Sequence, residues 1–192
     1  LLRRSGLIDD LTYLQLLGKT VNQVLQTPGR KLQSVAQSSF DAWVKYYRQD
    51  ENTPNITVSY YSKGALVALC LDLTLRQEGR STLDAVMQAL WLRCSGGPMT
   101  EADLAAVLQS LSGRSWSKEL ARWVHGTREL PLKPLLEGAG VTVLEEPAAL
   151  AQRLGLRQQP GGQQIALSPP QASPWGGEIR SRLFLPPPLG EG

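Results

Sequence analysis

Apolar residues recur at steps of three and four near the start of the chain. After Asp9 and Asp10, the positions that follow this spacing are Leu11, Leu14, Leu17, Val21 and Val24. The spacing places them on one face of an α-helix, and the two aspartates are candidates for its N-cap. The segment 27–30 contains a proline and a glycine, residue types that commonly end helices. The pattern therefore predicts a helix that ends near Leu25.

The segment 60–76 is apolar almost all round rather than on one face. Its apolar residues include Ala65, Leu66, Val67, Leu69, Cys70, Leu71 and Leu73. A helix of this kind is buried on most sides, as in the middle of a bundle. We therefore expect 60–76 to form the central helix of the fold, ended by Gly79.

Shorter helical segments are predicted around this central one, most of them with a capping residue at the start and a glycine or proline at the end. They are 34–40 with 41–47 as a continuation, 81–91 from a cap at Ser81 or Thr82, 100–113 from a capping arrangement of Thr100 with Asp103, 115–126 from Ser115 or Ser117, and 132–136. The polar segment 48–55 predicts a loop.

The character of the chain changes after Gly140. Residues 141–144 are short and β-branched and predict a strand, 147–154 suggests a small helix, and 163–167 suggests another strand. The rest of the last thirty or so residues is rich in Pro, Gly, Ser and Gln, and we expect it to be poorly ordered. The predicted fold class is mainly α, with a helical domain at 1–140 and a short irregular or β remnant at 141–192.

Charge and length narrow the function classes. The chain has 192 residues, 42% of them hydrophobic, with a net charge of +3. Its basic residues are scattered among acidic ones, so the concentrated basic patch that nucleic-acid binding needs is missing. No apolar run reaches the length of a membrane span. We expect a soluble protein, cytoplasmic or periplasmic, that binds neither nucleic acid nor membrane.

Catalytic motifs are almost absent from the sequence. His125 is the single histidine, so there is no H-E-x-x-H motif and no metal site is predicted in this chain. His125 next to Gly126 is typical of a helix C-terminus. A hydrolase in which His125 activates Cys70, Cys94 or a serine is the alternative, but no nucleophile motif supports it. The two cysteines are interpreted as buried apolar residues.

One polar group stands out at the head of the central helix, namely Tyr60, Tyr61 and Lys63. A phenol hydroxyl near a helix N-terminus can donate to an oxyanion, and the helix dipole adds positive potential there. The alternative is that the two tyrosines pack at the edge of the core with their hydroxyls in contact with water, and that Lys63 is a solvated side chain. The residues alone leave both interpretations open.

Several motifs resemble a known peptidase family. Residues 61–64, Tyr-Ser-Lys-Gly, are similar to the Y-x-K-G element of gluzincin aminopeptidases. The sequence around this element resembles the M61 glycyl aminopeptidases more closely. The stretches that carry this resemblance are 27–30, 39–43, 60–67, 71–73, 97–103 and 123–127. The similarity covers roughly residues 1–156. It implies a helical bundle like the C-terminal subdomain of thermolysin-like peptidases.

The resemblance also implies a function. Tyr61 corresponds to the residue that stabilises the oxyanion, and Tyr60 is a weaker candidate for that role. The family's zinc ligands lie upstream of such a segment. Residues 1–8 are similar to the sequence that follows those ligands in the family. We therefore expect a fragment of a zinc aminopeptidase, inactive alone, whose partner is the missing N-terminal catalytic half. The substrates would be peptides with a free N-terminus, Gly or Ala first.

The resemblance to the family becomes weaker toward the C-terminal end of the chain. Residues 145–156 resemble the start of a PDZ-like domain, but too few residues remain to close its sheet, and we expect a truncated start. A non-enzymatic helical module for protein interaction is the alternative function, favoured by the missing metal site. Its weakness is that Tyr61 and Lys63 would then have no reason to meet at a helix start.

Overall fold

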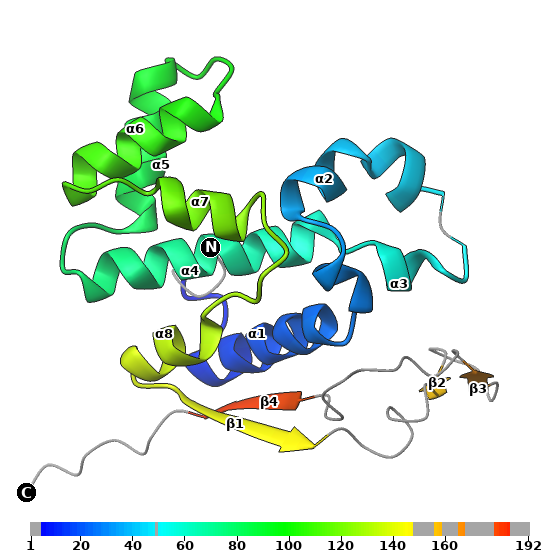
Figure 1. Cartoon of the computed structure of the whole chain (residues 1–192). Helices are drawn as coiled ribbons and strands as arrows, with labels where there is room; N and C mark the ends of the chain where they lie inside the picture. Colours follow the sequence, from blue (N-terminus) through cyan, green and yellow to red (C-terminus); the bar gives the residue numbers. More distant parts are fainter. Residues whose placement is uncertain (1–4, 49, 148–155, 159–164, 168–178, 185–192) are drawn as a thin grey trace, which may run out of the picture. The chain divides into compact units, whose positions relative to one another are not determined.

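The computed structural model describes residues 5–48, 50–147, 156–158, 165–167 and 179–184 (Figure 1). The protein is mainly helical, as the sequence predicts. The helices are α1 (Asp10–Leu25), α2 (Val35–Phe40), α3 (Thr53–Ile56), α4 (Tyr60–Gln77), α5 (Leu83–Cys94), α6 (Glu101–Ser112), α7 (Ser117–Trp123) and α8 (Leu132–Gly138), with a 3-10 turn η1 (Pro28–Lys31) and a π turn η2 (Ala42–Tyr46). The strands are β1 (Thr142–Pro147), β2 (Leu156–Gln158), β3 (Ile165–Leu167) and β4 (Ile179–Phe184).

The chain divides into two compact units. One comprises residues 1–26 and 142–192, and the other comprises residues 27–141. The predicted helix that follows Asp9 therefore groups with the strands rather than with the other helices. The assignment of residues 1–140 to a catalytic domain and of 141–192 to a PDZ-like start remains a prediction.

Within the first unit, α1 packs against β4, which pairs with β1 in an antiparallel ribbon. The register runs from Thr142 opposite Phe184 to Pro147 opposite Ile179. The Asp9 carboxylate accepts a hydrogen bond from the Thr12 backbone N–H at 2.8 Å, which confirms Asp9 as the N-cap of α1.

In the second unit, α4 supplies much of the core, as its apolar composition predicts. Cys70 and Leu75 of α4 are fully buried, as are Val86 of α5 and Leu108 of α6. The helix contacts α2, α5 and α8, while α7 contributes Leu120 to the same core. Figure 1 shows α4 running as the long central helix of this unit.

Capping residues set the starts of α5 and α6. Thr82 caps α5 by accepting a hydrogen bond from the backbone N–H of Ala85. At α6, the Thr100 hydroxyl accepts from the Asp103 N–H, and the Asp103 carboxylate accepts from the Thr100 N–H at 3.0 Å. This reciprocal arrangement confirms the predicted cap. It also lowers the pKa of Asp103 to about 2, because the hydrogen bonds from Thr100 and Arg93 favour the carboxylate.

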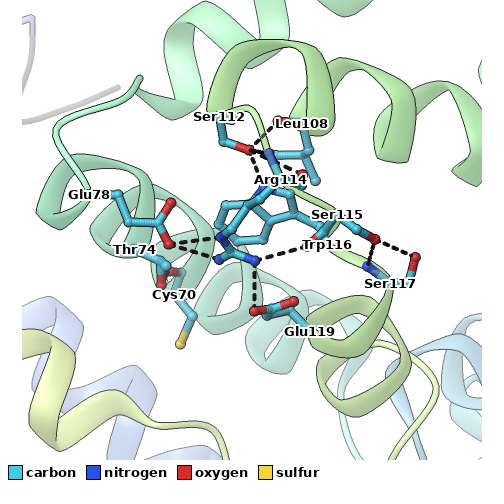
Figure 2. A network of polar contacts seen from close by, with 10 residues as sticks. All are labelled: Cys70, Thr74, Glu78, Leu108, Ser112, Arg114, Ser115, Trp116, Ser117 and Glu119. Atoms are coloured by element: carbon cyan, nitrogen blue, oxygen red, sulfur yellow. Dashed lines mark hydrogen bonds and ion pairs between the residues drawn. The ribbon is translucent and has the colours of Figure 1, made fainter.

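A polar network joins the end of α4 to the start of α7. The Arg114 guanidinium lies between the carboxylates of Glu78 and Glu119, each 2.9 Å away, and its central carbon lies 4.0 Å from the ring centroid of Trp116 (Figure 2). The buried Trp116 donates its indole N–H to the Ser112 hydroxyl at 2.8 Å. The two carboxylates raise the pKa of Arg114 above its usual value, the Glu78 hydrogen bond most strongly. This network fixes the turn between α6 and α7.

Two local expectations differ from the structure. The predicted loop 48–55 contains the first residues of α3, because Asp50 and Thr53 exchange hydrogen bonds of 2.8 Å that organise one helical turn. Strand β4 falls in the region expected to be poorly ordered, and it exists through its pairing with β1. The small helix expected at 147–154 lies almost wholly outside the described residues, as does most of the Pro-rich end.

The described residues contain no helix long and apolar enough to cross a membrane.

Candidate functional site

The N-terminus of α4 brings the predicted site residues together. Ser59 caps the helix by accepting a hydrogen bond from the Ser62 backbone N–H at 3.3 Å. Tyr60 is then half-buried and Tyr61 is 63% exposed, whereas Lys63, on the inner side of the first turn, is only 3% exposed. The helix start thus presents one phenol to solvent and turns one ammonium inward.

Buried polar side chains hold the segment just before α4. Val58 is 1% exposed, and its backbone N–H donates to the Gln33 side-chain oxygen at 3.3 Å. Its carbonyl oxygen accepts a hydrogen bond from the Ser38 hydroxyl. Gln33 and Ser38 are themselves buried. A buried backbone group without a partner is costly, so both side chains are needed to satisfy Val58.

A close backbone contact lies beside these hydrogen bonds. A Cβ atom added to Gly29 would lie 2.1 Å from the carbonyl oxygen of Thr57. Backbone cannot move aside as a flexible side chain can, so only glycine fits at this position. By contrast, a Cβ atom on Gly64 would meet only the Val35 side chain, at 3.9 Å, which is an ordinary contact. Gly29 is therefore required by packing, and Gly64 is not.

Lys63 completes the junction between η1 and α4. Its ammonium donates to the Arg30 carbonyl oxygen at 3.1 Å. Burial lowers the pKa of Lys63; the Glu129 carboxylate opposes this effect in part, and the Arg30 guanidinium adds to it. Arg30 also donates through Nε to Glu129 at 3.0 Å. Lys63 is thus a structural group inside the protein, and its interpretation as a solvated side chain is wrong.

Two tyrosine rings lie close together at the start of α4. The rings of Tyr60 and Tyr61 lie 4.2 Å apart between centroids and are tilted by 32°. Hydrogen bonding with Tyr60 and Tyr47 lowers the pKa of Tyr61, while hydrogen bonding with Tyr61 and Tyr47 raises the pKa of Tyr60. The Tyr47 ring packs against Trp43 at 5.2 Å. Tyr61 is therefore the more acidic of the two phenols at the helix start.

This arrangement can serve an oxyanion. Tyr61 is exposed, it lies in the first turn of an 18-residue helix, and hydrogen bonding with Tyr60 lowers its pKa. The N-terminus of a helix carries positive potential, which favours developing negative charge nearby. A phenol held there can donate its own proton to such a charge.

The described residues do not form a metal site. They contain no group of three His, Cys, Asp or Glu side chains that could hold a metal ion. His125 pairs with Glu101 at 2.7 Å, and both side chains are about half exposed. A zinc ion of the kind that the sequence resemblance implies therefore has no ligand set in this part of the chain, and no step can be derived through it.

Cys70 does not supply a nucleophile either. Cys70 is fully buried, and burial raises the pKa of its thiol to about 12. The thiolate is the reactive form, so this side chain is inert near neutral pH. Cys94 is a free thiol on α5 that is only half-buried, so its interpretation as a buried residue is wrong. The interpretation of Cys70 as a buried apolar residue is confirmed.

The sequence indicated some of these residues and missed others. It placed Tyr60 and Tyr61 at the start of α4, where the structure has them. It gave no signal for Gln33 or Ser38, because nothing in the sequence distinguishes a buried polar residue of this kind from an exposed one.

Comparison with solved structures identifies the class of protein that shares this fold. The crystal structure of an aminopeptidase N family protein from Idiomarina loihiensis is similar with a TM-score of 0.76 and 36% sequence identity. The similarity covers 86% of this chain and 31% of that one. The protein therefore has the fold of part of an aminopeptidase and spans about a third of that chain's length.

The family comparison is more specific. Residues 1–67 match the family described as M61 glycyl aminopeptidase. The matched residues include the glycine of η1, the whole segment before α4 and the tyrosines of the site. No curated protein matches the chain.

We expect the two glycines near the site to respond oppositely to alanine. Gly29→Ala should lower the free energy of unfolding by about 1–3 kcal/mol or more, because the methyl group must displace the Thr57 backbone. Gly64→Ala should leave it unchanged or raise it by up to about 1 kcal/mol, because alanine favours the helix and has room. Urea unfolding of both variants measures the difference. Equal effects would contradict the assigned packing.

Lys63 should make stability depend on pH in the alkaline range. Its lowered pKa means that the unfolded chain still holds the proton where the folded chain has released it. Between the folded pKa and the ordinary value of 10.5, the unfolded state therefore binds more protons. In that interval the free energy of unfolding contributed by Lys63 rises with pH. The stability of the native chain relative to Lys63→Met should thus increase as the pH approaches 10.5.

Urea unfolding at a series of pH values measures this difference. The matched control is Lys31→Met, which removes an exposed ammonium from the neighbouring turn. A native-minus-Lys63→Met difference that stays flat from neutral pH to 10.5 would show that the ammonium is not desolvated.

Proposed function

We propose that this chain is part of a zinc-dependent aminopeptidase and that Tyr61 donates a hydrogen bond to the oxyanion formed during peptide hydrolysis. The observation that carries the proposal is the exposed phenol in the first turn of α4, within residues that match the M61 glycyl aminopeptidase family. The similarity to an aminopeptidase N family structure supports the same class.

The contribution of Tyr61 is electrostatic. A tetrahedral intermediate concentrates negative charge on one oxygen, and a donor that is already oriented stabilises it without reorganisation. Gly29, Lys63 and Val58 hold the start of α4, so the phenol is carried on a fixed element. Sites built on rigid elements are positioned more accurately than sites on free loops.

Tyr60 is the weaker candidate for the same role. It is half-buried, and its hydroxyl hydrogen bonds to the neighbouring phenols. A half-buried phenol with a raised pKa is less available and a weaker donor to a substrate. Tyr61 is 63% exposed and its pKa is lowered, so it is the better candidate.

The remaining catalytic groups would come from residues outside this chain. The described residues hold no zinc ligand set, and the chain spans 31% of the similar aminopeptidase chain. The partner of this chain is then the N-terminal half of the catalytic domain, which would bind the zinc. The substrates are peptides with a free N-terminus, with Gly as the first residue, as the family name suggests, or with the similarly small Ala.

A second candidate is a non-enzymatic interaction module. The feature that favours it is an apolar groove of about 540 Å³ on α5, lined by Met87, Gln88, Trp91 and Leu92. The side chain of Trp91 is 68% exposed and that of Leu92 is 77% exposed. Exposed apolar surface of this kind marks interaction sites in many proteins.

A zinc and activity measurement separates the two functions. This chain and a longer parent polypeptide with the preceding sequence are assayed for bound zinc and for hydrolysis of Gly- and Ala-p-nitroanilide. We expect no turnover and no stoichiometric zinc in this chain, and both in the longer polypeptide. Metal-dependent turnover by this chain alone would refute the claim that it lacks essential catalytic groups. If both proteins were inert, the result would favour the interaction module.

Removing the Tyr61 hydroxyl should slow catalysis in the longer polypeptide. Tyr61→Phe should lower kcat by about 10²–10³-fold with little change in KM, because the hydrogen bond forms mainly in the transition state. The matched control is Tyr13→Phe, which removes a phenol from α1. An unchanged kcat for Tyr61→Phe would reduce Tyr61 to a packing residue.

A further inference from the structure

The turn η2 and the residues on either side of it expose a group of large apolar side chains. The exposed fractions are 90% for Phe40, 80% for Trp43, 72% for Val44 and 54% for Tyr47. Their spacing of three and four residues places them on one face of the helical turns. We call these four side chains the η2 patch. Single exposed apolar residues are ordinary, but a group of them on one face marks an interaction site.

The backbone beneath the η2 patch is fixed, although the patch is not packed into the core. Ala42, within the turn, is only 5% exposed. Its carbonyl oxygen accepts a hydrogen bond from the Tyr47 N–H at 3.0 Å, and the Lys45 ammonium pairs with the Asp41 carboxylate at 2.6 Å. Single π turns are rare and occur often at functional sites. The turn therefore presents apolar side chains to water from a defined backbone.

Hydrogen bonding ties this segment to the start of α4, which carries Tyr61. Helix α2 contacts α4 (Figure 1). The hydroxyl of Ser38, which lies in α2 shortly before Phe40, donates to the carbonyl oxygen of Val58. Val58 directly precedes the N-cap residue of α4. The η2 patch and the exposed Tyr61 phenol therefore lie on neighbouring parts of one compact unit.

We propose that the η2 patch is the docking surface for the other half of the catalytic domain, the polypeptide that would carry the zinc ligands. This occupant rests on the function proposed above. A donor to an oxyanion acts over one hydrogen bond, about 3 Å long, so the groups that act on the same substrate oxygen must come close to the Tyr61 hydroxyl. The polypeptide that carries those groups then covers the surface beside Tyr61, where the η2 patch offers it apolar area to bury.

The comparisons with known proteins favour this occupant. The η2 patch lies within residues 1–67, which match the M61 glycyl aminopeptidase family. In the similar aminopeptidase N family structure, the region that corresponds to this chain makes up 31% of a single polypeptide. A much longer stretch of that polypeptide is thus available to pack against the shared part.

The groove on α5 is the competing apolar surface, but its helix begins far from Tyr61. The Leu83 N–H at the start of α5 donates to the Asp72 carboxylate at 2.8 Å. Asp72 lies about 16 Å farther along α4 than Tyr61, at a rise of about 1.5 Å per residue. Helix α5 also lies outside residues 1–67. The η2 patch is therefore the better surface for a polypeptide that must reach Tyr61, and the α5 groove serves as the control.

Hydroxyl-radical footprinting tests the docking surface on the native protein. Trp43 of the η2 patch and Trp91 of the α5 groove are 80% and 68% exposed in this chain. This chain and the longer polypeptide are oxidised in dilute solution, and the oxidation rate of each tryptophan is measured by mass spectrometry. Trp43 should be oxidised about 5- to 10-fold more slowly in the longer polypeptide, because the core of an interface excludes water. Trp91 should be oxidised equally in both.

Equal oxidation of Trp43 in the two proteins would overturn the proposal, as would protection of Trp91 in place of Trp43. Protection of Trp43 that grows with the concentration of this chain alone would assign the η2 patch to a second copy and overturn it too. The footprint does not depend on turnover. A longer polypeptide that is inert but protects Trp43 would therefore refute the oxyanion function and support the docking surface.

A substitution measures how much the docking stabilises the protein. Trp43→Ser should leave the Tm of this chain nearly unchanged, because the side chain is exposed. In the longer polypeptide it should lower the Tm by about 3 °C or more, because a tryptophan buried at an interface contributes strongly. Trp91→Ser is the matched control and should change neither Tm. A shift of the same size in both proteins, or in neither, would contradict the docking role of Trp43.

Discussion

The backbone of Gly29 lies directly against that of Thr57, and the start of α4 depends on this contact. Two chain segments approach so closely that no side chain fits between them. The buried Val58 that follows finds its hydrogen-bond partners in the segment after Gly29, and Lys63 donates to the Arg30 carbonyl beside it. If the close contact were lost, these hydrogen bonds would lengthen together. The first turn of α4, with its exposed phenol, would then have no fixed origin.

The helices could be predicted because their signals are local. The apolar positions of α1 repeat at helical spacing, and the caps at Thr82 and Thr100 use side chains within three residues of the groups they satisfy. Strand β4 could not be predicted in this way, since its stability depends on β1, far away in sequence. The same distinction applies to Lys63. Its place in the helix was clear, but its burial depends on η1, a segment 33 residues away.

The site shows the same limit more strongly. Tyr61 was found through a short motif, and the structure places it where that motif implied. The motif says nothing of what supports the phenol. Support for the start of α4 comes from Gln33 and Ser38, whose residue types are common and whose spacing follows no period. Contacts between elements are set by tertiary packing, so residues of this kind become visible only when the fold is known.

The close contact at Gly29 has a consequence for how such a protein can diverge. The chain leaves the core after the buried Ala42 and returns at the buried Thr53, so the stretch 43–52 is tethered at both ends. The entropy cost of closing a loop grows only slowly with its length. A longer loop in this stretch therefore costs little free energy and leaves the contact between Gly29 and Thr57 in place. The start of α4 is thus held independently of the length of the exposed loop that precedes it.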